Sequence, residues 1–493
     1  MSLRMLAHLG LWRIAGIGLA AAFIFAVTAR VPPAEFGRFN LMLTFIQVMS
    51  ALFLAWPNSA MVRVAREEFA ATGRIGRAFG SRMLLQSLMF LLATLTVIAV
   101  ASPASTAIGM DPLAFMLLTM MLLFALSTFE LIAAAGQAVQ CFSAFASPSL
   151  LPRAALIMSV VLMSVGVPPI ALALLAALTV GYLLSGAAAL WALPRGALIP
   201  SSVDKKTLKA FFEIGWAMPI VTVCAFLVAA MDVWLLRALA GMNEAGTYGW
   251  AYNVNLLVMN LLAPISALLA PVAVDRTRSR SPAAVAGFVH VGEGAVALAA
   301  AAMPAGAALA GIVLGELPLR DYTPAIAPAL VLAAGAVFQL GMACLEPLVL
   351  IDARLVPRAA LIAASMATIN FALDVWLIPV IGIMGPALAT VASFAFGMLA
   401  YRRIVAAGYE LKSGAPWFAL TAGILAVGMA ALWQAMPPSF AVTVGIGLSL
   451  LLLFVGRRMG AFDALRELSL PPHLALLTDR LGSPRQNKVE KDN

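Results

Sequence analysis

The stretch Leu151–Ile157 reads LPRAALI, and the stretch Val356–Ile362 reads VPRAALI. Six consecutive letters, PRAALI, therefore recur 205 positions apart in a chain of 493 residues. A second pair of segments moves with them, because AEFGRF at Ala34–Phe39 and NEAGTY at Asn243–Tyr248 lie 209 positions apart. Two separate features at nearly the same offset indicate that one large unit occurs twice.

The composition identifies the solvent in which this unit folds. Hydrophobic residues make up 63% of the chain and charged residues 11%, whereas a soluble globular domain is about half apolar and about a quarter charged. The core of a soluble protein does not bury so large a share of apolar side chains, so part of the apolar surface must face lipid. The composition therefore predicts an all-α integral membrane protein.

Apolar segments long enough to cross a bilayer, which takes about 20 residues, occur fourteen times on this reading. The predicted spans are 12–30, 40–61, 83–102, 113–135, 154–167, 170–192, 214–238, 248–271, 287–314, 324–351, 359–379, 383–401, 416–436 and 439–456. The fifth and sixth spans are separated only by the prolines at 168 and 169.

The basic residues predict the orientation. With the N-terminus inside, 26 of the 31 lysine and arginine residues fall in inner loops or in the C-terminal tail, as the positive-inside rule requires. One predicted inner loop holds Arg63, Arg66, Arg74, Arg77 and Arg82, and another begins with Arg402 and Arg403. Both termini are therefore expected in the cytoplasm. The net charge of +9 is then explained by basic cytoplasmic loops and does not indicate binding to nucleic acid.

On this map, both PRAALI copies open a span from the inner side, six spans apart. An even spacing makes them parallel repeats related by an axis along the membrane normal. We expect a six-helix lobe at 1–195, a second at 205–403, an additional pair of spans at 404–457 and a cytoplasmic tail at 458–493. Proline suits a first helical position, and we expect Arg153 and Arg358 beside it to anchor at the headgroups.

Several classes of function are disfavoured. The three cysteines and three histidines are scattered, which predicts neither a disulfide framework nor a metal site. The phosphate-loop pattern of ATPases does not occur. The predicted outer loops are too short for a catalytic domain. We therefore expect no enzyme activity and no cofactor.

Two stretches resemble a known family. Thr28–Arg63 resembles the opening of bacterial polysaccharide transporters, and Ile369–Phe394 resembles their eleventh-to-twelfth helix junction, with Asn370, Ile378-Pro379, Gly382, Gly385, Ala387 and Thr390 in the family's pattern. The family is that of the lipid-linked oligosaccharide (O-antigen-type) flippases of the multidrug/oligosaccharidyl-lipid/polysaccharide exporter superfamily. The chain departs from it at Pro386, where alanine is usual, and at Trp56-Pro57-Asn58, where a glycine-containing turn is common.

The resemblance implies two lobes around a central cavity that opens alternately to either face of the bacterial inner membrane. It implies a polyprenyl-diphosphate-linked oligosaccharide as substrate, and a glycan polymerase or other assembly proteins as partners.

Ionisable side chains at membrane depth are functional candidates by default. Candidates for contact with a diphosphate are the basic residues Arg30, Arg63 and Arg237, all of which also suit ordinary anchoring at the membrane interface. Candidates for ion coupling are Asp232, Glu130, Glu346 and Asp374, each of which also suits hydrogen bonding between helices.

Three other classes of function were weighed against this one. A proton- or sodium-coupled drug antiporter shares the architecture and would use one acidic site. A major-facilitator transporter is also built from two parallel lobes, but only about 20 residues join spans six and seven here, where that class has a long loop. A membrane glycosyltransferase or polymerase needs large loops with clustered acids, histidines or arginines, and the sequence lacks such loops.

Overall fold

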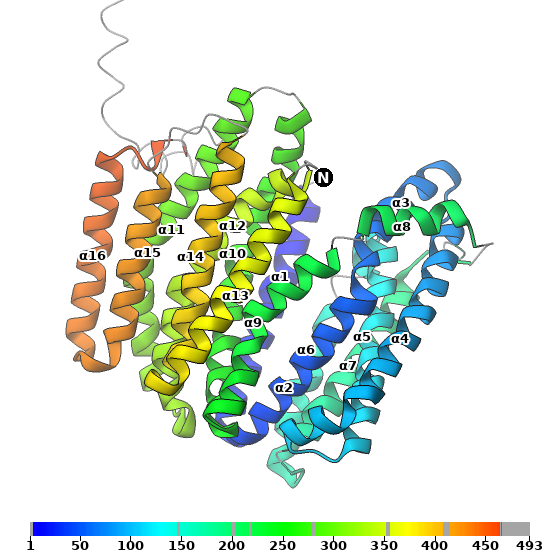
Figure 1. The fold of residues 1–493 in the computed structure, drawn as a ribbon, viewed down its shortest axis with the longest axis horizontal. Helices are drawn as coiled ribbons and strands as arrows, with labels where there is room; N and C mark the ends of the chain where they lie inside the picture. The colour runs from blue at the N-terminus through cyan, green and yellow to red at the C-terminus, as the bar shows by residue number, and fades with distance from the viewer. Residues whose placement is uncertain are drawn as a thin grey trace, which may run out of the picture. The chain divides into compact units, whose positions relative to one another are not determined.

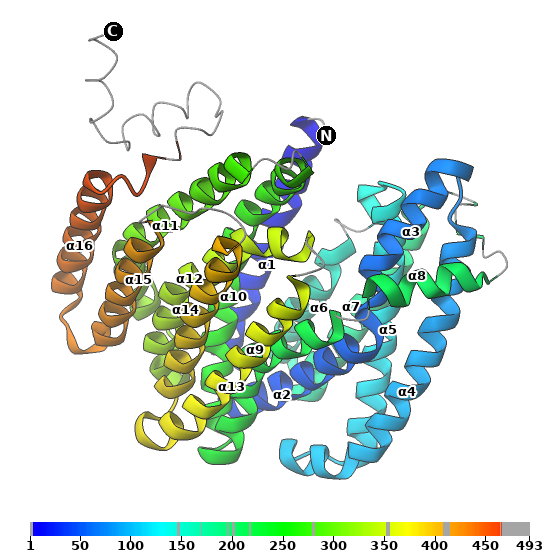
Figure 2. The ribbon, with the colours of Figure 1, turned by 45° about the horizontal axis from the view of Figure 1, so that its top comes forward.

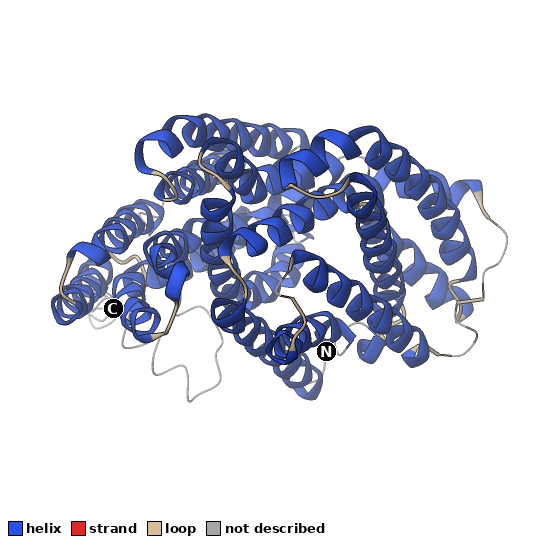
Figure 3. Ribbon diagram, turned by 90° about the horizontal axis from the view of Figure 1, so that it is seen from below, coloured by secondary structure: helices blue, strands red, loops and turns tan. Residues whose placement is uncertain are grey.

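The computed structural model of the chain describes residues 3–144, 148–168, 170–194, 196, 198–199, 203–215, 218–278, 282–351, 355–407, 415–463 and 465. Every regular element in these ranges is a helix (Figure 3). Packing of the chain on itself divides it into two compact units, residues 1–249 and 250–493, and each is described by itself. The predicted lobe and tail boundaries stay a prediction.

Each predicted span has a helical counterpart. The long helices of the first unit are α1 (Leu3–Arg30), α2 (Pro33–Met49), α3 (Pro57–Thr72), α4 (Gly76–Ile108), α5 (Pro112–Ala138), α6 (Leu151–Leu162), α7 (Ala171–Ala192), α8 (Lys205–Gly215) and α9 (Met218–Leu239). The helix α10 (Met242–Arg278) crosses the boundary, and the second unit continues with α11 (Pro282–Glu316), α12 (Ile326–Ile351), α13 (Val356–Ile381), α14 (Met384–Ala406), α15 (Ala415–Leu432) and α16 (Pro438–Arg458).

Among the described residues, eleven helical segments are long and apolar enough to cross a membrane. They correspond to eleven of the fourteen predicted spans, and α1, α9 and α10 lie at the other three. The all-helical, multi-pass class is confirmed, whereas the number fourteen stays a prediction.

Both PRAALI segments begin helices, as predicted. Pro152 and Pro357 lie in the first turns of α6 and α13, where a missing N–H costs no intrahelical bond. The packing around the two helices is also alike, because α7 packs on both α5 and α6, and α14 packs on both α12 and α13 (Figures 1 and 2). The repeat is therefore visible in each unit's internal packing.

The AEFGRF and NEAGTY segments, which are equivalent in the two repeats, pack directly against each other. A Cβ atom added to Gly246 on α10 would lie 1.7 Å from the Pro33 carbonyl oxygen, and one added to Gly37 on α2 would lie 2.7 Å from the Met242 carbonyl oxygen. Only glycine permits backbones to approach so closely. The sequence offset of 209 thus corresponds to a contact between equivalent glycines.

The second span is longer and less regular than predicted. Residues 33–72 form one continuous helical segment, in which a π-helical stretch, Ser50–Ala55, joins α2 to α3 just before Pro57. Proline lacks an N–H and disturbs the helical ladder, which accounts for the irregular turn at this point. The helix therefore continues eleven residues past 61, the predicted end of the membrane span, and where the span itself ends stays a prediction.

Several arginines that were assigned to inner loops lie on helices in the structure. Arg63 and Arg66 lie on α3, and Arg82 lies within α4 with 1% of its surface exposed. Arg402 lies on α14, whose last residue is Ala406. These four residues are therefore helical rather than in irregular loops, because the helices continue past the ends of the apolar runs, and their place on the inner side stays a prediction.

The short helix α8, which follows the first six spans, is amphipathic. Phe211 is buried and Phe212 lies 5.4 Å from Trp56 by ring centroids, so its apolar face packs on α3. Asp204 precedes the helix and accepts a hydrogen bond from the Lys206 amide at 3.1 Å. That bond, with further bonds from Thr207, lowers the pKa of the Asp204 carboxyl.

Candidate functional site

The three predicted substrate arginines lie in three different surroundings. Arg30 is the exposed last residue of α1. Arg63 is exposed on α3, 3.5 Å from Glu67, which is a surface pair of small energetic effect. The Arg237 Nε donates to the carbonyl oxygen of Ala107 at 2.9 Å and thereby satisfies the C-terminal turn of α4. A role in substrate binding stays a prediction for all three.

Two of the predicted coupling acids are fully buried. Asp232 on α9 accepts a 2.5 Å hydrogen bond from the Tyr248 hydroxyl on α10. Asp374 on α13 lies one turn after Asn370, whose amide lies 3.4 Å from the Thr390 hydroxyl on α14. Glu346 is half-buried on α12. Their roles in coupling are not decided by these contacts.

Glu130 belongs to a polar cluster inside the first unit. Arg82 on α4 donates from Nη2 to the Leu54 carbonyl oxygen at 2.6 Å and to the Asn58 Oδ1 at 2.9 Å. The Asn58 Nδ2 in turn lies 3.5 Å from the Glu130 Oε2, across α3 and α5. A buried guanidinium, an amide and a carboxyl are therefore arranged in series.

Two cavities flank Glu130. One, of about 230 Å³, is lined by Asn58, Gln137 and Glu130 with apolar neighbours. The other, of about 210 Å³, is lined by Gln47, Ser50, Tyr182 and Glu130, again with apolar neighbours. Each is large enough for several water molecules, and each offers the polar partners that water requires.

Arg82 and Asn58 were not among the predicted site residues. Arg82 directly precedes an apolar run, as an interface anchor does, and Asn58 follows a Trp-Pro pair that suggests a turn. The only available signal was that both are polar residues within a few positions of long apolar segments. Their burial follows from the packing of α3, α4 and α5.

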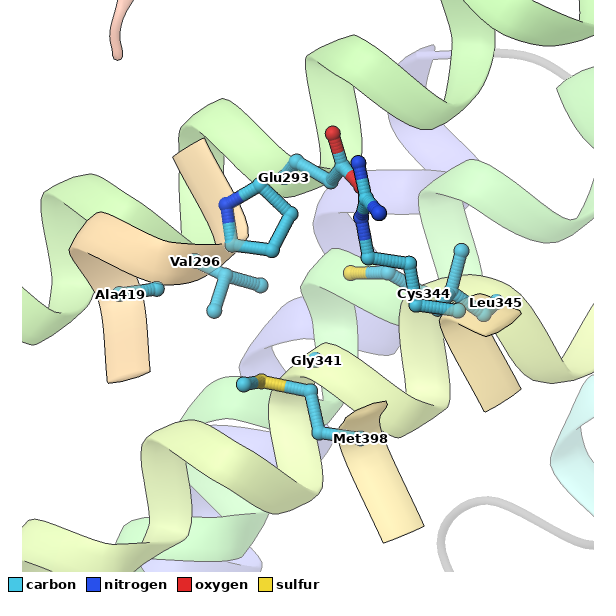
Figure 4. A pocket seen from close by; sticks show the side chains of 9 residues that line it. Glu293, Val296, Gly341, Cys344, Leu345, Met398 and Ala419 are labelled. Carbon is cyan, nitrogen blue, oxygen red and sulfur yellow. The ribbon is translucent and has the colours of Figure 1, made fainter. Parts of the chain in front are cut away.

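The second unit holds a separate buried ion pair. The Arg402 Nε on α14 lies 2.7 Å from the Glu293 Oε1 on α11, and the His290 Nδ1 lies 3.4 Å from the other carboxylate oxygen. Glu293, Cys344 and Met398 line one small pocket (Figure 4). Because the side chain of Glu293 is 6% exposed, Arg402 compensates a charge that would otherwise be costly there.

The described residues have the fold of a multi-pass membrane protein with polar clusters buried among its helices. The family model "Polysaccharide biosynthesis protein" matches residues 3–275, which is more than half of the chain. The chain belongs to this family of membrane transporters and flippases. No curated protein matches the chain in sequence.

Solved structures of low sequence identity share the fold. The lipid II flippase MurJ in an inward closed conformation matches with a TM-score of 0.60 and 13% identity, over 93% of this chain and 99% of that one. An inward-facing multidrug resistance MATE family transporter of the MOP superfamily matches with a TM-score of 0.59 and 12% identity, over 80% of this chain and 98% of that one. An outward-facing MATE family transporter matches with a TM-score of 0.54 and 12% identity, over 81% and 95%.

Proposed function

We propose that the chain is a flippase that moves a polyprenyl-diphosphate-linked oligosaccharide across the bacterial inner membrane by alternating access. The observation that carries this proposal is the match to the polysaccharide biosynthesis family in a chain whose regular structure, where described, is entirely helical and largely membrane-spanning. The fold shared with the lipid II flippase supports the same substrate class, since that protein's name gives a lipid as its cargo.

The chemistry of such a substrate explains why a protein is needed. A sugar headgroup and a diphosphate lose their hydrogen bonds to water in hydrocarbon, at a prohibitive cost. A polar passage between two lobes would hold the headgroup while the polyprenyl tail stays in the bilayer. Arg30, Arg63 and Arg237 are our proposed contacts to the diphosphate, because arginine binds phosphate through charge-assisted bonds.

Net export needs a source of free energy. We propose an ion gradient that acts through a buried acid, with Asp232, Glu130, Glu346 and Asp374 as candidates, together with consumption of the product outside by a glycan polymerase. Both termini are proposed to be cytoplasmic, on the distribution of basic residues.

The test is transport by the purified full-length chain in proteoliposomes. We expect accelerated transbilayer movement of a defined polyprenyl-diphosphate oligosaccharide relative to protein-free liposomes. Efflux of small organic cations in the same vesicles, without movement of the glycolipid, would instead establish the drug-antiporter alternative. Cysteine labelling at the predicted loops of intact cells checks the orientation separately.

A further inference from the structure

We propose that the first unit contains a proton path through α5, with Glu130 as the proton-carrying group and buried Arg82 as its counter-charge, positioned through Asn58. This inference rests on the proposed function and deepens it, because it assigns the coupling ion and two residues that no sequence pattern had suggested.

The cavities supply the path. They meet at Glu130 and reach along α5 from Gln137 to Leu122, which is about 22 Å at a rise of 1.5 Å per residue. Gln137 lies one residue before the end of α5, at its predicted cytoplasmic end, and Leu122 lies near the middle of the helix, so the second cavity extends from Glu130 toward the middle of α5. Water in both cavities would leave Glu130 as the single titratable carboxyl between them.

The chemistry of arginine fixes the orientation of the Asn58 side-chain amide. A guanidinium only donates hydrogen bonds, so the Asn58 atom that faces Arg82 at 2.9 Å is its oxygen. The amide nitrogen therefore faces Glu130, where it can donate to a carboxylate. At 3.5 Å this contact is long for a hydrogen bond, so it does not lock the carboxyl in one state.

Arg82 also has N–H donors besides the Nη2 group that bonds to Leu54 and Asn58. Within the described part of the chain, its Nε and Nη1 are buried and have no hydrogen-bond partner. Buried donors are nearly always satisfied, so these two suit ordered water or the Glu130 carboxylate after a side-chain movement.

The charged and titratable groups around Glu130 come from three helices, namely α4 (Arg82), α6 (Arg153) and α7 (Tyr182). Arg82 on α4 interacts electrostatically with Glu130. Tyr182 on α7 lines the second cavity and interacts with both Glu130 and Arg153. The lining residues from α2, the π-helical stretch and α3 are uncharged. Arg82 is thus the charge that most directly compensates a Glu130 carboxylate.

Proton binding then changes the charge balance of the site. A proton that arrives through one cavity binds a carboxylate oxygen of Glu130 and leaves Arg82 without its compensating charge. An uncompensated buried charge is strongly unfavourable, so this state favours another helix arrangement. The proton leaves for water in the other cavity, and the Glu130 carboxylate again balances the charge of Arg82. Protonation thereby biases the equilibrium between conformations.

The first experiment compares glycolipid transport by the wild type, Glu130→Gln and Glu67→Gln in proteoliposomes with and without a pH gradient. Glu67 is exposed on α3 and serves as the matched control. The quantity compared is the transport rate with the pH gradient divided by the rate without it. We expect this ratio to fall to one in Glu130→Gln and to stay at the wild-type value in Glu67→Gln. A wild-type ratio in Glu130→Gln overturns the proton path, whereas no transport by the wild type refutes the proposed function.

The second experiment does not need transport. Single cysteines replace Gln47 and Ala133, one in each cavity lining, in full-length protein whose native cysteines are replaced by serine. We expect both to react with a small water-soluble thiosulfonate reagent, and a cysteine at buried Ala125 to stay unmodified. Protection of either cavity position shows that water does not reach Glu130 from that side, and the path is refuted even if Glu130→Gln fails to fold.

Discussion

Replacement of Gly246 by alanine tests the contact between the two repeats. The new Cβ atom would lie 1.7 Å from the Pro33 carbonyl oxygen and 2.9 Å from the Gly37 nitrogen. Both obstacles are backbone atoms, so a side-chain rotation does not relieve the clash. Restoring an ordinary separation of about 3.4 Å to the oxygen would require the two helix ends to part by roughly 1.7 Å, which is severe for a close-packed interface.

Overpacking typically costs about 1–3 kcal/mol, and we expect Gly246→Ala at or above the upper end of this range. With a shift of about 2–4 °C per kcal/mol for domains of this size, the unfolding midpoint in detergent should fall by on the order of 5 °C or more.

The matched control is Gly18→Ala on α1, where an added Cβ meets nothing within 4 Å. Alanine is a better helix former than glycine, so this variant should be as stable as the wild type or slightly more stable. The assay is thermal unfolding followed by size-exclusion chromatography of the detergent-solubilised protein. An unchanged midpoint for Gly246→Ala would refute the close approach of α2 and α10.

Three further outcomes are expected. Arg402→Ala should lower stability by about 3–5 kcal/mol because it removes the arginine that compensates the buried Glu293 carboxylate, and the double variant with Glu293→Gln should recover part of that loss in the same thermal assay. Arg237→Ala should destabilise by about 1–3 kcal/mol, since a charged donor to Ala107 is lost; if transport per folded molecule also falls, Arg237 contacts substrate as well. Asp204→Ala should speed amide hydrogen exchange in the first turn of α8, while Asp204→Asn, another good cap, should not. The pKa of Asp204 is lowered in the folded protein. The stabilisation that its carboxylate gives to α8 is therefore present above the unfolded pKa of about 3.9 and is lost as the pH falls through the folded value. Exchange in the wild type during incubation at such an acidic pH should approach that of Asp204→Ala at the same pH.

The sequence by itself determined that the chain folds in a lipid bilayer, where its helices lie along the chain, and that one unit is repeated. Each depends on information that is local along the chain: apolar run length, the residue type at a helix start, and the offset between similar segments. Pro152 and Pro357 therefore begin helices as predicted, and each expected span has its helix. The break between the fifth and sixth spans was also predicted, from the adjacent prolines at 168 and 169, and the first of the two segments ends in a turn that Gly166 caps with a φ of 108°.

Only the tertiary structure decided which polar residues are buried and what they contact. Arg82 and Arg63 have similar surroundings in sequence, yet one is 1% exposed as a residue and the other has a side chain 70% exposed. The difference arises because α3 and α5 cover one face of α4, and helical periodicity indicates a face without naming the helix that packs on it. For the same reason, similarity between the segments around Gly37 and Gly246 indicated a repeat, whereas their contact depends on how α2 and α10 cross.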